Sequence, residues 1–359
     1  MATIIERPRA DGTTAYLVQI VVKRDGKIAH RESRTFDRRP AAATWAKARE
    51  KELANPDGLR KAKVGKKTLA DAIDKYIAES SKAIGRTKSQ VLTSVKNYKI
   101  AEMLCGDIAS TDIVDFANDL AVSRQPQTVA NYLSHLSSIF AIARPAWGIP
   151  LDEKEMRDAQ KVLKRLGVVA KTKQRHRRPT LDELNRLLEH YAERAIKYPQ
   201  SVNMAPIILF AIFSTRRQDE ITRILWDDLD EDHSRVLVRD MKDPGEKIGN
   251  NVWCDLPPEA LALIKAQPKS APEIFPFETR TVSSSFTKTC SFLEIDDLHF
   301  HDLRHEGVSR LFELGWTIPH VAAVSGHRSW NSLKRYTHIK QREVDKYAGW
   351  KHRPAVTKD

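Results

Sequence analysis

The chain has 359 residues and a formal net charge of +13, with 60 lysines and arginines against 47 aspartates and glutamates. This length suits two or three domains rather than a single core. A hydrophobic content of 41%, a mean hydropathy of −0.49 and the lack of any 18-residue apolar run exclude a membrane-spanning protein. We expect a cytoplasmic protein, because the N-terminus lacks a secretory pattern and the three cysteines stand far apart without a Cys-x-x-Cys motif.

The surplus of positive charge indicates a polyanionic partner. Basic residues clearly outnumber acidic ones over residues 1–66. A second basic cluster contains no acid and supplies the DNA-binding candidates Lys171, Lys173, Arg175, Arg177 and Arg178. Clustered cations raise the affinity for phosphate by releasing counterions. The charge therefore predicts nucleic-acid binding but no particular catalysis.

The first 60 residues predict a small β module with one helix. Alternating segments at 16–22 and 27–36 flank an Asp25-Gly26 step that favours a tight hairpin, and residues 3–8 can add a third strand. A helix is predicted from Pro40 to Ala54. Residues 61–67 read as a basic linker.

The pattern then becomes helical over residues 68–168. Its clearest apolar stripe recurs at helical spacing and consists of Val129, Tyr132, Leu133, Leu136, Ile139, Phe140 and Ala143. We predict a helical bundle here and assign it no chemistry.

A third domain is predicted over residues 178–348, followed by a tail at 349–359. The stretch 171–179 before it is either a solvated connector or one that binds DNA. A capping-box spacing at 180–183 begins a helix, an apolar helix follows at 204–213, and strands at 235–238 and 251–256 are joined by a turn at 242–247. Helices return from His301 onward. Residues 339–350 are expected to form a short helix, with Val344, Tyr347 and Trp350 exposed on one side.

Three features of this last domain carry chemistry. Arg217 and Glu220 share a helical face, so that the carboxylate can hold the guanidinium, although such pairs are usually surface ion pairs. His301 and Arg304 place an imidazole and a phosphate binder on one face. His301 and His305 also have the spacing of a helical zinc pair, but no glutamate or cysteine completes a site, so we expect neither a metal nor a cofactor.

The third feature is a tyrosine close to the C-terminus. Gly326-His327 is followed nine residues after the histidine by Tyr336. Lys334, Arg335 and His338 flank this tyrosine, and cations lower the pKa of a phenol and attract phosphate. A lone buried tyrosine usually serves packing, but this one has a basic neighbourhood.

Taken in order, Arg-x-x-Glu, His-x-x-Arg and Gly-His with a tyrosine nine residues beyond resemble the tyrosine recombinase (phage integrase) family. The likeness is greatest to integrases of prophages and genomic islands and to shufflon-type DNA invertases, and it covers about residues 180–347. It implies a multidomain, mainly α fold with α+β parts. Residues 1–60 would form an arm-type DNA-binding module, 68–168 a core-binding DNA clamp, and 178–348 a mixed α/β catalytic domain.

The resemblance implies a role for each matching residue. Tyr336 would be the nucleophile, Arg217 and Arg304 the cations on the scissile phosphate, and Glu220 the group that orients Arg217. His301 and His327 would exchange protons or donate hydrogen bonds, with His301 the candidate to accept the proton of Tyr336. Lys242, with Lys247 as the alternative, would be the catalytic lysine on the β-hairpin. Ser214-Thr215-Arg216-Arg217 departs from the frequent Thr-Gly-x-Arg pattern, which opens a choice between Arg216 and Arg217; the spacing to Glu220 favours Arg217.

The implied activity is site-specific DNA recombination through a 3′-phosphotyrosyl intermediate, without metal or ATP, for integration, excision or inversion. The expected partner is double-stranded DNA with specific recombination sites, bound by a homotetramer that is a monomer in free solution. Accessory DNA-bending proteins are candidates, no membrane is expected, and a bacterial or phage-encoded protein would associate with the nucleoid when acting. The segment after Tyr336 could simply fold back on its own domain, but the resemblance implies that it docks on a neighbouring protomer.

Two alternatives remain. A type IB topoisomerase uses the same kinds of residue and would relax DNA that lacks any recombination site. A catalytically silent DNA-binding regulator would bind DNA without forming a covalent adduct.

Overall fold

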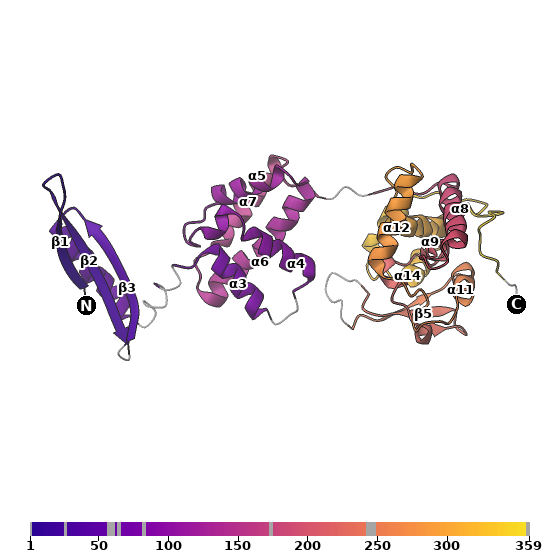
Figure 1. The fold of residues 1–359 in the computed structure, drawn as a ribbon, viewed down its shortest axis with the longest axis horizontal. Helices are drawn as coiled ribbons and strands as arrows, with labels where there is room; N and C mark the ends of the chain where they lie inside the picture. Colours follow the sequence, from indigo (N-terminus) through magenta and orange to yellow (C-terminus); the bar gives the residue numbers. More distant parts are fainter. Residues whose placement is uncertain are drawn as a thin grey trace. The chain divides into compact units, whose positions relative to one another are not determined.

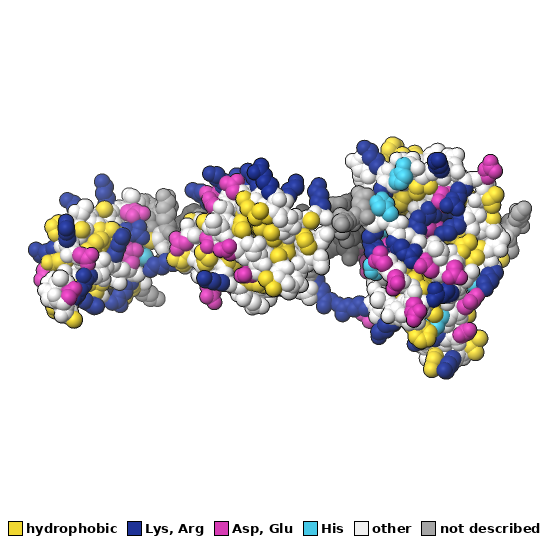
Figure 2. Space-filling view, turned by 90° about the horizontal axis from the view of Figure 1, so that it is seen from above, with side chains coloured by type: hydrophobic (Ala, Val, Ile, Leu, Met, Phe, Trp, Pro, Cys, Tyr) yellow, Lys and Arg dark blue, Asp and Glu magenta, His cyan; other side chains and the backbone are white. Residues whose placement is uncertain are grey.

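The computed structural model describes residues 2–24, 27–55, 62, 66–80, 84–171, 175–241 and 249–356 (Figure 1). The chain divides into two compact units, residues 1–173 and 174–359. Within the described residues no helix is both long and apolar enough to cross a membrane. Lys and Arg side chains occur on every part of the chain, with Asp and Glu side chains among them (Figure 2).

The N-terminal segment forms the predicted three-stranded sheet with one helix. Strands β1 (Ala2–Pro8), β2 (Thr14–Arg24) and β3 (Lys27–Phe36) pair antiparallel in chain order. Helix α1 (Arg39–Ala54) begins with a proline in its first turn, and its Ala42 and Ala46 pack with Val18 and Ile20 of β2. The predicted Asp25-Gly26 turn lies outside the described residues.

The described residues between 69 and 165 fold mainly into helices, as predicted. The helices are α3 (Leu69–Glu79), α4 (Arg86–Val95), α5 (Ser110–Ala121), α6 (Pro126–Trp147) and α7 (Glu153–Arg165). All seven residues of the stripe on α6 are buried. Thr68 begins α3 with a capping box in which its hydroxyl accepts a hydrogen bond from the Asp71 amide. The bundle core therefore follows the period read from the sequence.

The second unit is helical around one small sheet. Helix α8 (Leu181–Lys197) starts at the predicted capping box of Thr180 and Glu183. Helix α9 (Met204–Ser214) lies in the core and is apolar on all sides. The sheet contains β4 (Leu229–Asp230), β5 (Arg235–Val238) and β6 (Val252–Asp255) in antiparallel order. The strands β5 and β6 were predicted, whereas the two-residue β4 was not.

Four further helices complete the unit: α11 (Pro258–Lys265), α12 (Thr279–Phe292), α13 (Phe300–Glu313) and α14 (Ile318–Ser325). The single turn α10 (Gln218–Ile221) follows α9, and short 3₁₀ turns end at Ser332 and Tyr336. Helices α11 and α12 were not predicted. Helix α12 is rich in Ser and Thr, whose helix propensity is low, and only four of its residues are buried. Its sequence therefore gives little indication of a helix.

Close packing of α13 on α9 sets the position of the site. A Cβ atom on Gly307 would lie 2.0 Å from the carbonyl oxygen of Ile212. Only glycine therefore lets α13 approach the end of α9 so closely. This approach brings Arg304, one turn earlier on α13, to the backbone of Thr215.

The C-terminal segment differs from the prediction. Residues 340–353 form turns rather than a helix, and Tyr347 and Trp350 are buried, whereas only Val344 of the three is exposed. The Tyr347 hydroxyl donates to Glu306 at 2.9 Å, and the Trp350 indole donates to Asn185 at 2.7 Å. The prediction of an exposed helix was wrong, because the buried Glu306, the half-buried Asn185 and the ring of Phe213 in the same unit give these aromatic residues partners.

Replacing Tyr347 by alanine should destabilise the second unit by about 3 to 5 kcal/mol, because a buried aromatic ring is lost and Glu306 loses a donor. Val344→Ala in the same segment is the matched control and should change stability by less than about 0.5 kcal/mol. Calorimetry of the full chain measures both. Equal unfolding temperatures for the two variants would contradict the packing described.

Candidate active site

The first part of the site is the turn between α9 and α10. Thr215 has a left-handed backbone, with φ of 59°. This conformation is strained by about 1 to 3 kcal/mol for a β-branched residue and explains why the common pattern has glycine there. The Thr215 carbonyl oxygen accepts a hydrogen bond from Arg304 Nη1 at 2.5 Å. Thr215, which stands where the common pattern has glycine, thus keeps the backbone turn but adds strain to it.

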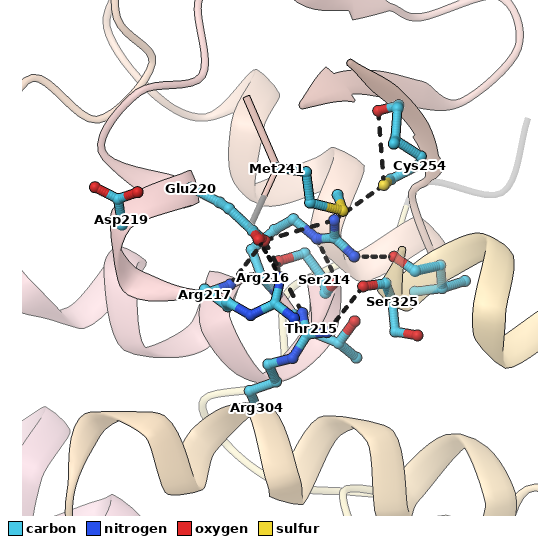
Figure 3. Close-up of polar contacts among 12 residues, drawn as sticks. Ser214, Thr215, Arg216, Arg217, Asp219, Glu220, Met241, Cys254, Arg304 and Ser325 are labelled. Carbon is cyan, nitrogen blue, oxygen red and sulfur yellow. Dashed lines mark hydrogen bonds and ion pairs between the residues drawn. The ribbon is translucent and has the colours of Figure 1, made fainter. Parts of the chain in front are cut away.

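Glu220 lies at the centre of three guanidinium groups (Figure 3). Its carboxylate is 2.5 Å from Arg217 Nη1, 3.7 Å from Arg216 Nη1 and 3.9 Å from Arg304 Nη1. The side chain is 2% exposed. Burial by itself raises the pKa of Glu220, but the three arginines outweigh it and lower the pKa to about 2.

Arg216 and Arg217 point to different surroundings (Figure 3). The Arg216 side chain is fully buried, where its Nη1 lies 3.0 Å from Cys254 Sγ and its Nη2 donates to the carbonyl of Val324. The Arg217 side chain keeps 26% of its surface exposed. Arg216 therefore ties the turn to β6 and to the end of α14, and Arg217 is the one accessible to a ligand. The spacing argument had favoured Arg217, but the buried tie through Arg216 was not predicted.

Arg304 and His327 are adjacent. Arg304 is 4% exposed, and its Nη2 donates to the Ser325 carbonyl at 3.0 Å and lies 3.2 Å from His327 Nε2. Burial, then the charges of Arg304 and Arg217, lower the pKa of His327 to about 3, so this ring is neutral near pH 7. Gly326 caps the end of helix α14, and a Cβ atom on it would lie 2.6 Å from the Met241 side chain. The glycine therefore lets the following histidine reach Arg304.

Tyr336 does not contact the histidine that was expected to serve it. Its hydroxyl forms a hydrogen bond of 2.5 Å with Nδ1 of His305, and its ring stacks on Phe312 with an interplanar angle of 10°. His301 lies one turn earlier on α13, with its ring meeting that of His305 edge-on. His305 was considered only for its zinc-like spacing to His301, and that spacing was the signal that it shares the same face.

The pKa of Tyr336 moves against the direction expected from its basic neighbours. Burial raises it, and Arg335 and Arg304 only partly oppose this effect. Tyr347, the other tyrosine of this region, is fully buried and donates to Glu306, and burial also raises its pKa strongly. Tyr336 is thus the better placed of the two for chemistry, but it needs a base to lose its proton.

The basic cluster before α8 is paired with acids of its own unit. Three arginines make these ion pairs: Arg175 with Asp302 at 2.9 Å and Asp297 at 2.8 Å, Arg177 with Glu183, and Arg178 with Glu306 at 2.6 Å and Glu313 at 2.8 Å. Lys171 is exposed. Their carboxylate partners make these arginines structural connections, which the sequence did not indicate.

Several expected residues lie outside the described part of the chain. Lys173 falls within residues 172–174, and both lysine candidates, Lys242 and Lys247, fall within residues 242–248. Across the described ranges, no group of three or more His, Cys, Asp or Glu side chains is arranged to hold a metal ion.

Comparison with known proteins finds a family match within the second unit. Residues 177–343 match the phage integrase family. The chain is 29% identical over 314 residues to the shufflon-specific DNA recombinase of Escherichia coli, covering 80% of this chain and 76% of that protein. The motif-based resemblance is thereby confirmed.

The fold is also similar to solved structures. A lambda integrase dimer bound to a COC′ core site has a TM-score of 0.58 at 19% identity, over 95% of this chain and 96% of that one. The Tn1549 transposon integrase in complex with a circular intermediate DNA has a TM-score of 0.59 at 12% identity, over 79% of this chain and 97% of that one. The expected mainly helical recombinase fold with small sheets is confirmed by these likenesses.

Replacing Glu220 by glutamine tests the central ion cluster. Because its folded-state pKa is depressed from 4.5 to about 2, the carboxylate stabilises the fold above pH 4.5, and this contribution is lost as the pH falls toward 2. We expect Glu220→Gln to lower the free energy of unfolding by about 3 kcal/mol at pH 7, with a difference from wild type that shrinks below pH 4.5. Denaturant titrations from pH 3 to 7 measure this. The exposed Glu343→Gln serves as control, and a difference independent of pH would refute the assignment.

Proposed function

Residues 177–343 form a phage integrase family domain, and on this basis we infer that the chain is a tyrosine-type site-specific DNA recombinase. The observation that carries this proposal is the cluster of Arg216, Arg217 and Arg304 around Glu220. Three positive charges face one negative charge, so two are uncompensated among the described residues of the site. Such an excess in a buried setting favours an anion, and a DNA phosphate supplies one.

The cluster suits phosphoryl transfer. Negative charge grows on the non-bridging oxygens of a phosphodiester as a nucleophile attacks, and guanidinium groups already in place stabilise that charge. Arg217 and Arg304 are the proposed phosphate ligands, oriented by Glu220. Two histidines are proposed to donate or exchange protons at the phosphate. His327 is neutral and lies next to Arg304, and His301 lies on the exposed side of α13.

Tyr336 is the proposed nucleophile. Attack of its oxygen on phosphorus would form a 3′-phosphotyrosyl bond and release the 5′ oxygen, which needs a proton. We assign that proton to Lys242, or to Lys247. The covalent bond conserves the energy of the broken linkage, so the strand can be rejoined to a new partner without ATP. The arrangement calls for neither a metal nor a cofactor.

The wider assembly is also proposed. We assign DNA clamping to residues 68–168 and arm-site binding to residues 1–60, with the exposed Lys171 at the edge of the DNA. The partner would be double-stranded DNA carrying specific recombination sites. By likeness to the lambda integrase tetramer bound to a Holliday junction, this chain would assemble as a homotetramer on paired sites. We place this activity in the cytoplasm, on the nucleoid.

The nucleophile is tested with a nicked suicide substrate taken from the DNA that flanks the gene. Wild type should form an adduct that resists SDS, and Tyr336→Phe should abolish the adduct while leaving DNA affinity within about twofold, because only the attacking oxygen is lost. Tyr347→Phe is the matched control and should still form the adduct. A silent DNA-binding regulator would give no adduct with wild type, and a topoisomerase would relax plasmids that lack the site.

The two neighbouring arginines should separate catalysis from stability. Arg217→Ala should slow cleavage of the suicide substrate by about 10² to 10³-fold and change the free energy of unfolding by less than about 1 kcal/mol. Arg216→Ala should instead destabilise the fold by about 3 kcal/mol, because it removes a buried guanidinium that joins three elements. Single-turnover cleavage and urea unfolding measure the two effects. The reverse pattern would make Arg216 the phosphate ligand.

A further inference from the structure

His305 is the group in contact with the oxygen that would attack DNA. Its Nδ1 lies 2.5 Å from the Tyr336 hydroxyl. His301, the residue expected to take this proton, contacts the ring of His305 rather than the hydroxyl, with ring centroids 4.8 Å apart at 85°. The hydrogen bond therefore joins helix α13, which carries His305, to the 3₁₀ turn Lys334–Tyr336, which carries the tyrosine.

Two neighbouring side chains fix the position of the Tyr336 ring and thereby its hydrogen bond to His305. Phe312, two turns further along α13, stacks on the ring with centroids 6.0 Å apart, and Arg335 Cζ lies 5.5 Å from the ring centroid. A cavity of about 200 Å³ opens beside the pair, and its titratable lining consists of Arg175, His176, Arg178, Arg335 and His338 with His305 and Tyr336. Among the described residues no carboxylate lines it, so the bases that they offer are imidazoles, and His305 is the one on the hydroxyl.

We propose that His305 is the catalytic base that accepts the proton of Tyr336 as the tyrosine attacks DNA. The inference rests on the recombinase function proposed above. In this step the Tyr336 O–H bond breaks and an N–H bond forms at His305 Nδ1, while the phenolic oxygen bonds to phosphorus. The phosphorus–5′ oxygen bond breaks, and the 5′ oxygen takes its proton from the proposed lysine. His301 keeps the role at the phosphate that is proposed above.

The electrostatics set the protonation states from which this transfer would start. Burial, then the neighbouring His301 and Arg335, lower the pKa of His305 to about 4, so its ring is neutral at pH 7 and has a lone pair to accept the proton. Burial raises the pKa of Tyr336, so the phenol stays protonated at rest. The proton then moves only as the oxygen–phosphorus bond forms and the oxygen loses its basicity, which is how a general base acts.

Two substitutions at His305 separate proton transfer from positioning. His305→Ala removes both the hydrogen bond and the base, whereas His305→Asn can still accept the hydrogen bond but cannot take the proton. We expect both variants to bind the suicide substrate as wild type does and to form the adduct about 10² to 10³-fold more slowly. Added imidazole should restore the rate of His305→Ala at least tenfold. His338→Ala, which lines the same cavity, should stay within about twofold of wild type.

The outcomes distinguish this inference from the proposed function. If wild type forms no adduct, the function itself fails. If wild type forms it and His305→Asn is equally fast, His305 only positions the tyrosine and the inference is overturned. Failure of imidazole to rescue His305→Ala that binds DNA normally would also overturn it. Should the alanine variant unfold, as judged by calorimetry, the rate of the asparagine variant, which keeps a hydrogen-bond acceptor, decides alone.

Discussion

The buried carboxylate of Glu220 organises the second unit, because three guanidinium groups from two segments converge on it. Arg216 and Arg217 come from the turn after α9, and Arg304 comes from α13. Removing these charges from water is unfavourable unless they are paired, so the carboxylate and the arginines depend on each other. Through Arg216 the same cluster reaches β6 and the end of α14. One acidic residue thus holds together the elements that carry the proposed phosphate ligands.

Helix α13 has two polar faces with different tasks. One face presents His301, Arg304 and His305 to the site. The opposite face buries Glu306, Arg310 and Glu313, which pair with segments from both ends of the unit. Arg178, from before α8, pairs with Glu306 and Glu313, and the C-terminal segment contributes Asp345 to Arg310 and Lys346 to Glu306. Each buried acid needs hydrogen-bond donors. The ion pairs that supply them hold the segment before α8 and the C-terminal segment against α13, the helix that carries the site.

The arrangement separates two requirements of metal-free phosphoryl transfer. The arginines that would neutralise phosphate lie around Glu220 and Thr215, whereas Tyr336, the proposed nucleophile, lies against His305 and Phe312. The phenol is protonated and hydrogen-bonded at rest, and the proposed reaction needs it to meet a phosphate held by the first group. Because Tyr336 is buried and protonated at rest, this proposed nucleophile would not react with other molecules before DNA occupies the site.

Much of this could be predicted from the sequence, since residues three, four or seven apart must share a helical face. The stripe on α6, the pairing of Arg217 with Glu220 and the ordered motifs through Tyr336 all follow from such local spacing, and they were sufficient to indicate the family. The sequence could not say which partner each face meets. Tertiary packing alone placed His305 rather than His301 on the tyrosine, buried Arg216 against Cys254, paired the basic cluster with acids, and packed Tyr347 and Trp350 onto their own unit. Each of these contacts joins residues far apart in the chain. A polar group that is removed from water must find a hydrogen-bond partner, and the spacing of residues along the chain does not indicate which partner that is.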